Sequence, residues 1–536
     1  MKRGLVWTGA AIAGLVAAVV MVRLLNPLPS LSGREATRAV APDDHDVVGS
    51  AIKQGIVRHP GQSGLRLLPD GREAFATRML LARGAEHSID AQYYIWHDDL
   101  TGGLLFDELR AAADRGVRVR LLLDDNNTAG LDPLLARLNA HPHIELRLFN
   151  PFTVRSPRLL GWAADFGRLN HRMHNKSFTI DNGVTVIGGR NIGDEYFGAG
   201  GGALFVDLDT LAVGPVVQDT SRDFDAYWNS VSAYPAERIL GSDAGQRRLS
   251  RADRATPAAR DYLQALRETG VVQQLAEGSL ELTWAPVTLV SDDPSKALGR
   301  AQRSDLLITQ LDEVLGVPRE RLGLVSGYFV PTEALVTKLG RVAGRGAKVQ
   351  VVTNAFEATD VPVVHSGYAD DRKSLLRAGV RLWELKKEAG GNAARRNLSA
   401  LGSGVAGSGG SGSGGGTGSA SGVPQGAGQA LHAKTFTADG KRLFVGSFNL
   451  DPRSARLNTE LGFVIDSPAL TGFVEQRLRE VLPRAAYQVR LNKDGNLEWV
   501  EQRGDTTVVH RTEPGTTPWS RFVISALSLL PVEWLL

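Results

Sequence analysis

Short apolar runs alternate with amphipathic segments along the body of the chain. Residues 88–96 form an apolar run, residues 103–114 place apolar side chains at helical spacing, and residues 115–124 add a turn and a second apolar run. This succession predicts a strand, a crossover helix and a parallel strand. The same succession recurs over residues 322–330, 332–343 and 345–353. A further apolar run follows each copy, at residues 144–149 and 380–385. The pattern predicts an α/β fold in which one unit is used twice.

The spacing of matching landmarks supports this internal duplication. Gly116 and Gly346, one in each turn, lie 230 positions apart, whereas His174 and His432, one in each of two later motifs, lie 258 positions apart. The second copy therefore holds 28 additional residues, which is the length of the Gly/Ser-rich stretch 402–429. Such a composition is typical of a flexible insertion, so we predict that this stretch is disordered.

The N-terminus has the pattern of a membrane segment. Lys2 and Arg3 precede an apolar run over residues 4–22, which Arg23 closes. As a helix, this run measures ~28 Å, close to the ~30 Å of a bilayer's hydrocarbon core. We expect an uncleaved anchor, with a cleaved signal as the alternative, because no clear small-x-small cleavage site follows. The flanking charges set the orientation weakly and favour a catalytic body outside the cytoplasm.

The predicted organisation has six segments. They are an N-terminal transmembrane anchor or signal (1–25), a linker (26–50), the first unit (51–235), a helical linker (236–280), the second unit with its insertion (281–515) and an apolar tail (516–536). The apolar residues 522–536 are too few to span a membrane, so they predict an interfacial foot or a last element of the core.

Composition narrows the function classes. The chain has 536 residues, 43% of them hydrophobic, which is enough for two packed domains. A net charge of only +3 does not by itself indicate a nucleic-acid partner. The absence of cysteine excludes disulfides, cysteine-bound zinc and a catalytic thiol.

Two motifs of identical spacing carry the candidate chemistry. Each places a histidine, a lysine and an aspartate at positions 0, +2 and +7, and an asparagine 17 positions after the histidine; the residues are His174, Lys176, Asp181 and Asn191 in the first copy and His432, Lys434, Asp439 and Asn449 in the second. Residues two apart on a strand point to one face, so the histidine and lysine of each motif can enter one cleft. The aspartates precede glycine-containing turns, so we expect them to fix the loops.

This set of groups suits attack on a phosphodiester. Two ammonium groups and the asparagine amides can neutralise the phosphate oxygens as charge builds. One imidazole can attack phosphorus and form a phosphohistidine, while the other protonates the leaving alkoxide and then deprotonates the incoming alcohol. No metal or cofactor is required, and no metal-binding motif is present. Asp207 and Glu460 each precede a matching proline by eight residues, and we predict that they orient the imidazoles.

These residues resemble the phospholipase D superfamily and, within it, bacterial cardiolipin synthases of the C type. The resemblance extends over about residues 50–510 and is closest in the segments 93–102, 169–178, 188–197 and 446–460. It implies two tandem phospholipase D-like α/β/α units that form a pseudo-twofold bilobal body. It further implies that a phosphatidyl group moves to phosphatidylglycerol, from phosphatidylglycerol or phosphatidylethanolamine, to make cardiolipin. His174 is the expected nucleophile and His432 the general acid and base, with the reverse assignment nearly as well supported.

The expected partners are phospholipid substrates and the bacterial inner membrane, with no nucleic acid and no defined protein partner. The alternatives are a hydrolytic phospholipase D that releases phosphatidic acid, a nuclease of the same superfamily, and an inactive membrane scaffold. A basic run interleaved with aromatic residues is open to two interpretations, a lipid headgroup surface or a solvated loop; it comprises Arg155, Arg158, Arg168 and Arg172 with Trp162 and Phe166.

Overall fold

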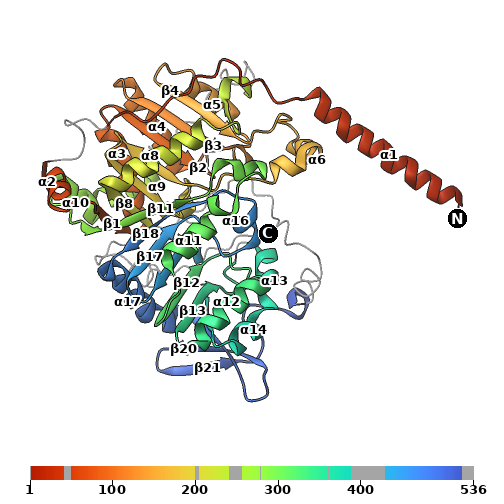
Figure 1. The fold of residues 1–536 in the computed structure, drawn as a ribbon, viewed down its shortest axis with the longest axis vertical. Coiled ribbons are helices and arrows are strands. Elements are labelled where there is room, and N and C mark those ends of the chain that lie inside the picture. Colours follow the sequence, from red (N-terminus) through yellow and green to blue (C-terminus); the bar gives the residue numbers. More distant parts are fainter. Residues whose placement is uncertain are drawn as a thin grey trace.

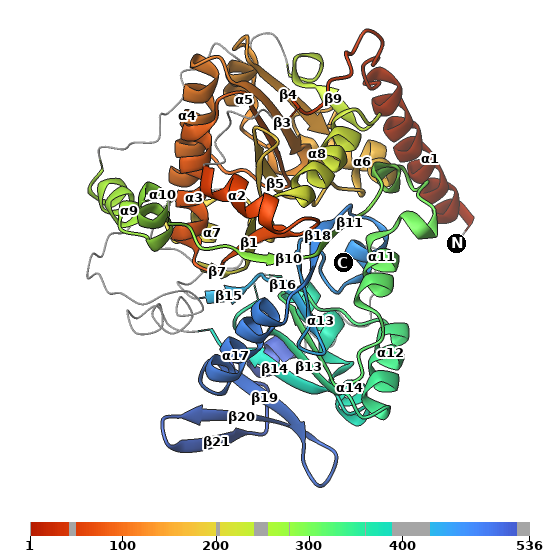
Figure 2. The ribbon, with the colours of Figure 1, turned by 60° about the vertical axis from the view of Figure 1, so that its left-hand side comes forward.

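The fold was taken from a computed structural model, which describes residues 2–41, 50–199, 204–240, 256–277, 279–359, 361–387 and 429–521. These residues form two lobes, each built around a mixed β-sheet (Figure 1). The first lobe, drawn in red to yellow, precedes the second, drawn in green to blue (Figure 2). The fold class is therefore mixed α/β, as predicted.

The first lobe contains a nine-stranded sheet in the order β10-β1-β8-β6-β5-β2-β3-β4-β9. Strands β2, β3 and β4 run parallel, and the remaining pairs are antiparallel. The strand bounds are β1 Ser63–Leu68, β2 Ser88–Tyr93, β3 Arg118–Asp124, β4 Ile144–Phe149, β5 Ser177–Ile180, β6 Val184–Gly188, β8 Asp209–Val213, β9 Ala233–Pro235 and β10 Thr283–Ala285.

The second lobe repeats this order in a ten-stranded sheet, β11-β18-β17-β16-β12-β13-β14-β19-β20-β21. Its parallel strands are β12, β13 and β14. The bounds are β11 Val287–Ser291, β12 Arg321–Ser326, β13 Lys348–Asn354, β14 Arg381–Leu385, β16 Lys434–Ala438, β17 Arg442–Gly446, β18 Leu461–Asp466, β19 Ala486–Leu491, β20 Leu497–Arg503 and β21 Thr506–His510. The eight strands from β11 to β19 match those from β1 to β9 in order and direction, so the predicted duplication and both βαβ units are confirmed.

Helices cover the sheets and bury their apolar faces against them. The helix of the first βαβ unit, α4, starts one turn earlier than predicted because Asp99 caps it by accepting the N–H of Gly102. The helix bounds are α2 Ser50–Arg58, α3 Gly71–Gly84, α4 Leu100–Asp114, α5 Asp132–Asn139, α6 Arg158–Leu169, α7 Asp194–Phe197, α8 Pro215–Trp228, α9 Pro257–Arg267, α10 Gly270–Glu277, α11 Leu307–Leu315, α12 Glu333–Gly344, α13 Pro362–Ala369, α14 Arg372–Arg377, α16 Pro452–Arg456 and α17 Pro468–Ala485.

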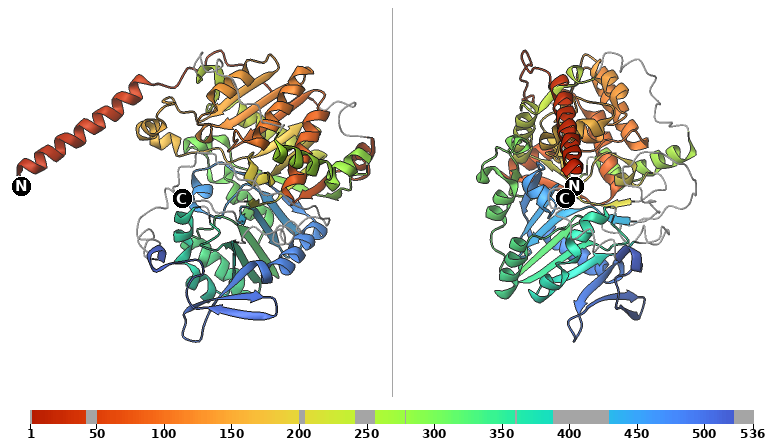
Figure 3. Two further views of the ribbon diagram at one scale, coloured as in Figure 1. Left: turned by 180° about the vertical axis from the view of Figure 1, so that it is seen from behind. Right: turned by 90° about the vertical axis from the view of Figure 1, so that its right-hand side faces the viewer.

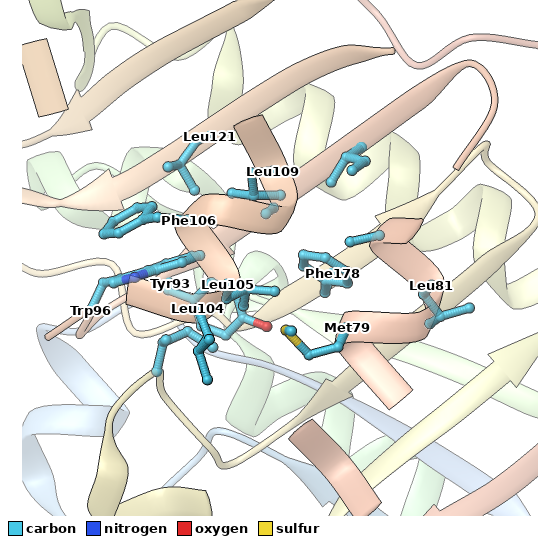
Figure 4. Close-up of a cluster of buried hydrophobic side chains, with 14 of the residues drawn as sticks. Met79, Leu81, Tyr93, Trp96, Leu104, Leu105, Phe106, Leu109, Leu121 and Phe178 are labelled. Carbon is cyan, nitrogen blue, oxygen red and sulfur yellow. The ribbon is translucent and has the colours of Figure 1, made fainter. Parts of the chain in front are cut away.

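Each lobe has its own apolar core, and a third cluster joins them. Figure 4 shows part of the first core, where Leu105 and Leu109 of α4 lie close to Phe178 of β5. A smaller cluster takes Leu65 and Ile187 from the first sheet and Leu443 and Phe463 from the second. Because this cluster contains side chains of both sheets, the two lobes pack directly against each other through buried contacts.

The N-terminal helix α1 (Lys2–Leu25) projects away from the two lobes (Figure 3). Within the parts of the chain that the structure describes, no helix combines the length and apolarity that a membrane crossing needs. The prediction of a transmembrane anchor in residues 1–25 is therefore not supported. The insertion at 402–429 lies outside the described residues apart from Gln429, and the apolar residues 522–536 lie outside them entirely.

Candidate active site

The two histidine motifs occupy matching places in the two sheets. His174 and Lys176 lie just before β5, and His432 and Lys434 lie at the start of β16, after the short strand β15 (Gln429–Leu431). Each motif strand continues into a tight hairpin, with β6 and β17 respectively. Both histidines precede the strand proper, and Lys434 Nζ lies 3.1 Å from His432 Nε2, so this pair of side chains lies on one side.

A backbone hydrogen bond links each histidine to the opposite lobe. The His174 N–H donates to Thr459 O at 2.8 Å, and the His432 N–H donates to Val206 O at 2.8 Å. Next to the His432 bond, β15 pairs in parallel with β7 (Leu204–Val206), and the two strands lie side by side between the lobes (Figure 2). Each histidine is thus bonded to the residue that precedes the predicted orienting acid of the opposite lobe.

The orienting acids act across the lobe boundary. His174 Nδ1 lies 2.7 Å from Glu460 Oε2, and His432 Nδ1 lies 2.5 Å from Asp207 Oδ2. All four side chains are buried, and each histidine is only 5% exposed. A carboxylate that accepts the Nδ1 proton leaves Nε2 as the basic nitrogen. The arrangement of the site is therefore symmetric: each lobe supplies one histidine and also the acid that is bonded to the histidine of the opposite lobe.

Both lysines lie close to the histidines. Lys176 Nζ donates to His174 O at 2.6 Å, and Lys434 Nζ donates to His432 O and lies 3.1 Å from His432 Nε2. The charge of each lysine also acts on the opposite lobe, since Lys434 lowers the pKa of His174 and Lys176 lowers that of His432. The four residues therefore belong to one electrostatic site.

Burial and charge set the protonation of the site. Burial and the nearby lysines hold the pKa of His174 well below its usual range and lower the pKa of His432 to about 4. Burial opposes ionisation of Asp207, but His432 and Lys434 hold its pKa at about 2. Both imidazoles are therefore neutral at neutral pH, and the carboxylate of Asp207 is ionised.

Glu460 differs from Asp207 in its electrostatic surroundings. Burial raises the pKa of Glu460 to about 7, although Lys176 and Ser447 favour the ionised form. Burial likewise lowers the pKa of Lys176 to about 7. Ser447 Oγ donates to Glu460 Oε2, while the matching position in the first lobe is Gly189, which has no such donor. The two acid–histidine pairs are consequently not equivalent.

The motif aspartates lie at the far ends of their strands, away from the histidines. Asp181 accepts the backbone N–H groups of residues 86, 87 and 88, and Asp439 accepts those of residues 319, 320 and 321. Both aspartates have positive φ values, 51° and 52°, as a tight turn requires. They tie the hairpin to the start of the neighbouring central strand, so their place agrees with a role in fixing the loop.

The two asparagines differ. Asn191 is fully engaged, since Oδ1 accepts the Ile95 N–H at 3.2 Å and Nδ2 donates to the Tyr196 hydroxyl at 3.0 Å. Asn449 is also buried, but among the described residues its Oδ1 has no hydrogen-bond partner. Asn449 therefore has an acceptor oxygen available for a donor group of a ligand, whereas both polar atoms of the Asn191 side chain are engaged.

Known proteins share this architecture. The family description "Cardiolipin synthase, PLD-like domain" matches residues 81–228 and 417–482. Cardiolipin synthase C of Escherichia coli is 47% identical over 91% of this chain and 99% of its own length. The chain belongs to the cardiolipin synthase family.

More distant proteins are also similar to this chain over most of its length. A cardiolipin synthase of Geobacillus kaustophilus is 25% identical over 82% of this chain and 70% of its own length. The crystal structure of phosphatidylserine synthase from Haemophilus influenzae covers 90% of this chain and 98% of its own at 12% identity, with a TM-score of 0.55. That likeness shows that this cardiolipin synthase family member shares the two-lobed fold of the solved enzyme.

Aromatic rings surround the histidines in this cardiolipin synthase family member, and sequence reasoning missed them. The Tyr94 ring lies 5.0 Å from that of His174, whereas His432 has three neighbours, Tyr196 at 5.3 Å, Phe205 at 5.2 Å and Tyr328 at 6.0 Å. These rings come from loops and short elements, whose positions no periodic pattern predicts. They make the surroundings of His432 more apolar than those of His174.

One group of potential metal ligands is present among the described residues, His97, Asp99 and Glu195. His97 is paired with Glu195 at 3.2 Å, and Asp99 caps α4. These contacts explain why the three side chains lie together. None of the three belongs to the two histidine motifs.

Proposed function

We propose that this chain is a phosphatidyltransferase that makes cardiolipin through a phosphohistidine intermediate. One observation carries the proposal: two buried histidines, each bonded to the acid of the opposite lobe, with two lysines whose charges act on both. Such a set provides a nucleophile, a proton carrier and positive charge for one phosphorus atom. The 47% identity to a cardiolipin synthase over nearly its whole length supports the same activity.

The first half-reaction transfers the phosphatidyl group to the enzyme. His174 Nε2 attacks phosphorus in line, and the P–O bond to the headgroup breaks as the P–N bond forms. His432 Nε2 takes up a proton from solvent when the anionic phosphodiester binds, and it delivers that proton to the leaving alkoxide. Lys176 and Lys434 stabilise the charge on the phosphate oxygens, and Asn449 contributes through its Nδ2 amide, which donates a hydrogen bond. The donor is phosphatidylglycerol, which releases glycerol, or phosphatidylethanolamine, which releases ethanolamine.

The second half-reaction uses the same groups in reverse. His432 Nε2 removes the proton from the terminal hydroxyl of phosphatidylglycerol. The alkoxide attacks phosphorus, the P–N bond breaks and His174 is restored with cardiolipin as the product. Asp207 supports this assignment, because a carboxylate whose pKa is about 2 stays ionised and stabilises the imidazolium of His432 in both steps.

Water competes with phosphatidylglycerol for the phosphohistidine, so a hydrolytic phospholipase D is the second candidate. The low exposure of both histidines favours transfer, since it limits the access of bulk water. A nuclease has less support, because the relatives above are cardiolipin synthases over nearly the whole chain.

We also place the protein at the inner membrane of a bacterium, with the catalytic body outside the cytoplasm. Its substrates are membrane lipids, and α1 exposes Trp7, Leu15, Met21, Leu24 and Leu25. Apolar side chains on a helix that stands away from the lobes are suited to an attachment to lipid.

Lipid analysis of the purified protein tests the function. On vesicles of phosphatidylglycerol, with and without phosphatidylethanolamine, the expected product is cardiolipin and the expected co-product is glycerol or ethanolamine. His174→Ala and His432→Ala should each abolish turnover. Phosphatidic acid as the main product would favour the hydrolase instead, and activity close to wild type in either variant would contradict the shared site.

A further inference from the structure

The outward face of α6 is exposed and apolar. Between positions 156 and 167 every exposed residue is uncharged, among them Leu159, Leu160, Ala163 and Phe166. Leu159 is 77% exposed, Leu160 48% and Phe166 39%. Large apolar side chains gathered on one face of a protein mark an interaction surface.

The charged residues around this face are turned inward. Arg155 Nη1 donates to Asp125 Oδ2 at 2.6 Å, Arg158 Nη2 donates to the Thr128 hydroxyl at 2.9 Å, and Arg168 Nη2 donates to Pro151 O at 2.9 Å. Arg172 is fully buried against Asp124. The arginines of this run are therefore engaged by groups of the first lobe, so a lipid surface at this segment does not rest on their charges. Instead, the arginines fix α6 to the first lobe and leave an apolar face outside.

This face continues onto the base of α1. The C-terminal end of α1 lies near α6, where Arg23 Nη2 is 3.6 Å from Asp165 Oδ1 (Figure 1). A cavity of about 310 Å³ between them is lined by residues of both, including Leu24 and Ala164. Met21, Leu24 and Leu25 are also exposed, so the apolar area extends over both helices.

The α6 face is also close to the site along the chain. α6 ends at Leu169, five residues before His174, a stretch that spans at most ~17 Å. Arg453 of the second lobe holds the first residue of this stretch, donating to Asn170 Oδ1 at 2.8 Å. A surface that contacts α6 is therefore within a short, fixed distance of the nucleophile.

We infer that the α6 face is a docking surface for a phospholipid bilayer. Leu159, Leu160 and Phe166 enter the boundary between headgroups and acyl chains, beside α1, and hold the site at the lipid surface. The inference rests on the proposed function, because the occupant is the source of the substrates. Since the face carries no charge, docking through α6 needs no anionic lipid and resists salt.

A single cysteine reports directly on this contact, because the chain contains none. Ala163→Cys in the full-length protein, labelled with the environment-sensitive dye NBD, should brighten and shift to the blue on vesicles of phosphatidylcholine. Quencher-bearing phosphatidylcholine should then dim it. The matched control is Thr506→Cys, which is exposed on β21 of the second lobe and should show neither change. An unchanged spectrum at position 163 on vesicles that bind the protein would overturn the inference.

A triple variant links docking to turnover. In Leu159→Gln/Leu160→Gln/Phe166→Gln, the vesicle concentration for half-maximal rate should rise by ~10-fold or more, because three partly exposed apolar side chains lose their contact with lipid. The rate on dispersed short-chain phosphatidylglycerol, below its micelle concentration, should stay unchanged. The control variant Val57→Gln/Val317→Gln/Val509→Gln replaces exposed valines elsewhere and should leave both rates unchanged.

The outcomes separate the two claims. Loss of activity on short-chain lipid in the wild type would refute the proposed function rather than the docking surface. An unchanged vesicle dependence in the triple variant would refute the docking surface alone. A dimeric wild type that becomes monomeric in the triple variant, with vesicle binding intact, would show that a second copy covers α6 and would also refute it.

Discussion

The crossed pairing of acids and histidines predicts that Asp207→Asn disables His432 and leaves His174 able to react. Asp207 lies in the first lobe together with His174, yet its carboxylate is bonded to His432 of the second lobe. The amide cannot stabilise the imidazolium that forms when His432 carries the proton. The defect should therefore appear in proton transfer and not in the attack on phosphorus.

The pKa of Asp207 sets the expected magnitude. Its neighbours hold the pKa at about 2, below the ordinary 3.8, which corresponds to about 2 kcal/mol of net stabilisation of the carboxylate by its surroundings. Loss of that stabilisation from a transition state with a protonated His432 should lower the rate by roughly 30-fold.

An activated substrate separates the steps. The p-nitrophenyl ester of phosphatidic acid releases p-nitrophenolate, which needs no protonation at neutral pH, so phosphohistidine formation no longer depends on His432. With Asp207→Asn, the initial burst of p-nitrophenolate should keep nearly its wild-type rate, while transfer to phosphatidylglycerol slows. Glu460→Gln should slow the burst itself. A burst that is lost in Asp207→Asn, or intact in Glu460→Gln, would refute the crossed assignment.

Three further predictions follow from the contacts of the site. Ser447→Ala removes a hydrogen bond that favours the ionised form of Glu460, whose pKa is about 7, so the acid limb of kcat/KM should move to higher pH, and Ser447→Thr should restore it. Lys176 loses its charge as pH rises through about 7, so kcat/KM should fall on that side, and Lys176→Arg should remove this alkaline limb even if its maximum rate is lower. Asp181→Ala removes the acceptor of three N–H groups at a buried turn and should lower the free energy of unfolding by ~3 kcal/mol in a denaturant titration. Asp439→Ala, at a more exposed turn, should lower the free energy of unfolding by less. Equal losses in the two variants would contradict the role given to burial.

Much of the fold could be predicted because periodicity and turns are local signals. The strand over residues 144–149 was placed at its observed bounds, and the duplication followed from the equal spacing of the motifs. The proline alignment also brought Asp207 and Glu460 into the candidate site. Which histidine each acid would meet could not be read from spacing, because the crossing depends on how the two lobes pack.

Other parts of the site depend on contacts between residues distant in sequence. Tyr94 and Tyr328 reach the histidines from the loops that follow β2 and β12, and no pattern distinguished them from core residues. The arginines around α6 look like a basic surface in the sequence, but Arg155 and Arg172 are paired with acids from another segment, Asp125 and Asp124. Charge patterning alone does not reveal which cations are paired within the protein.

The burst amplitude with the p-nitrophenyl ester tests the central claim most directly. If both histidines serve one phosphorus atom, the wild-type protein releases one p-nitrophenolate per chain before steady turnover, and the phosphatidyl group is recovered on His174. Two equivalents per chain, with label on both His174 and His432, would show two independent sites and contradict the account.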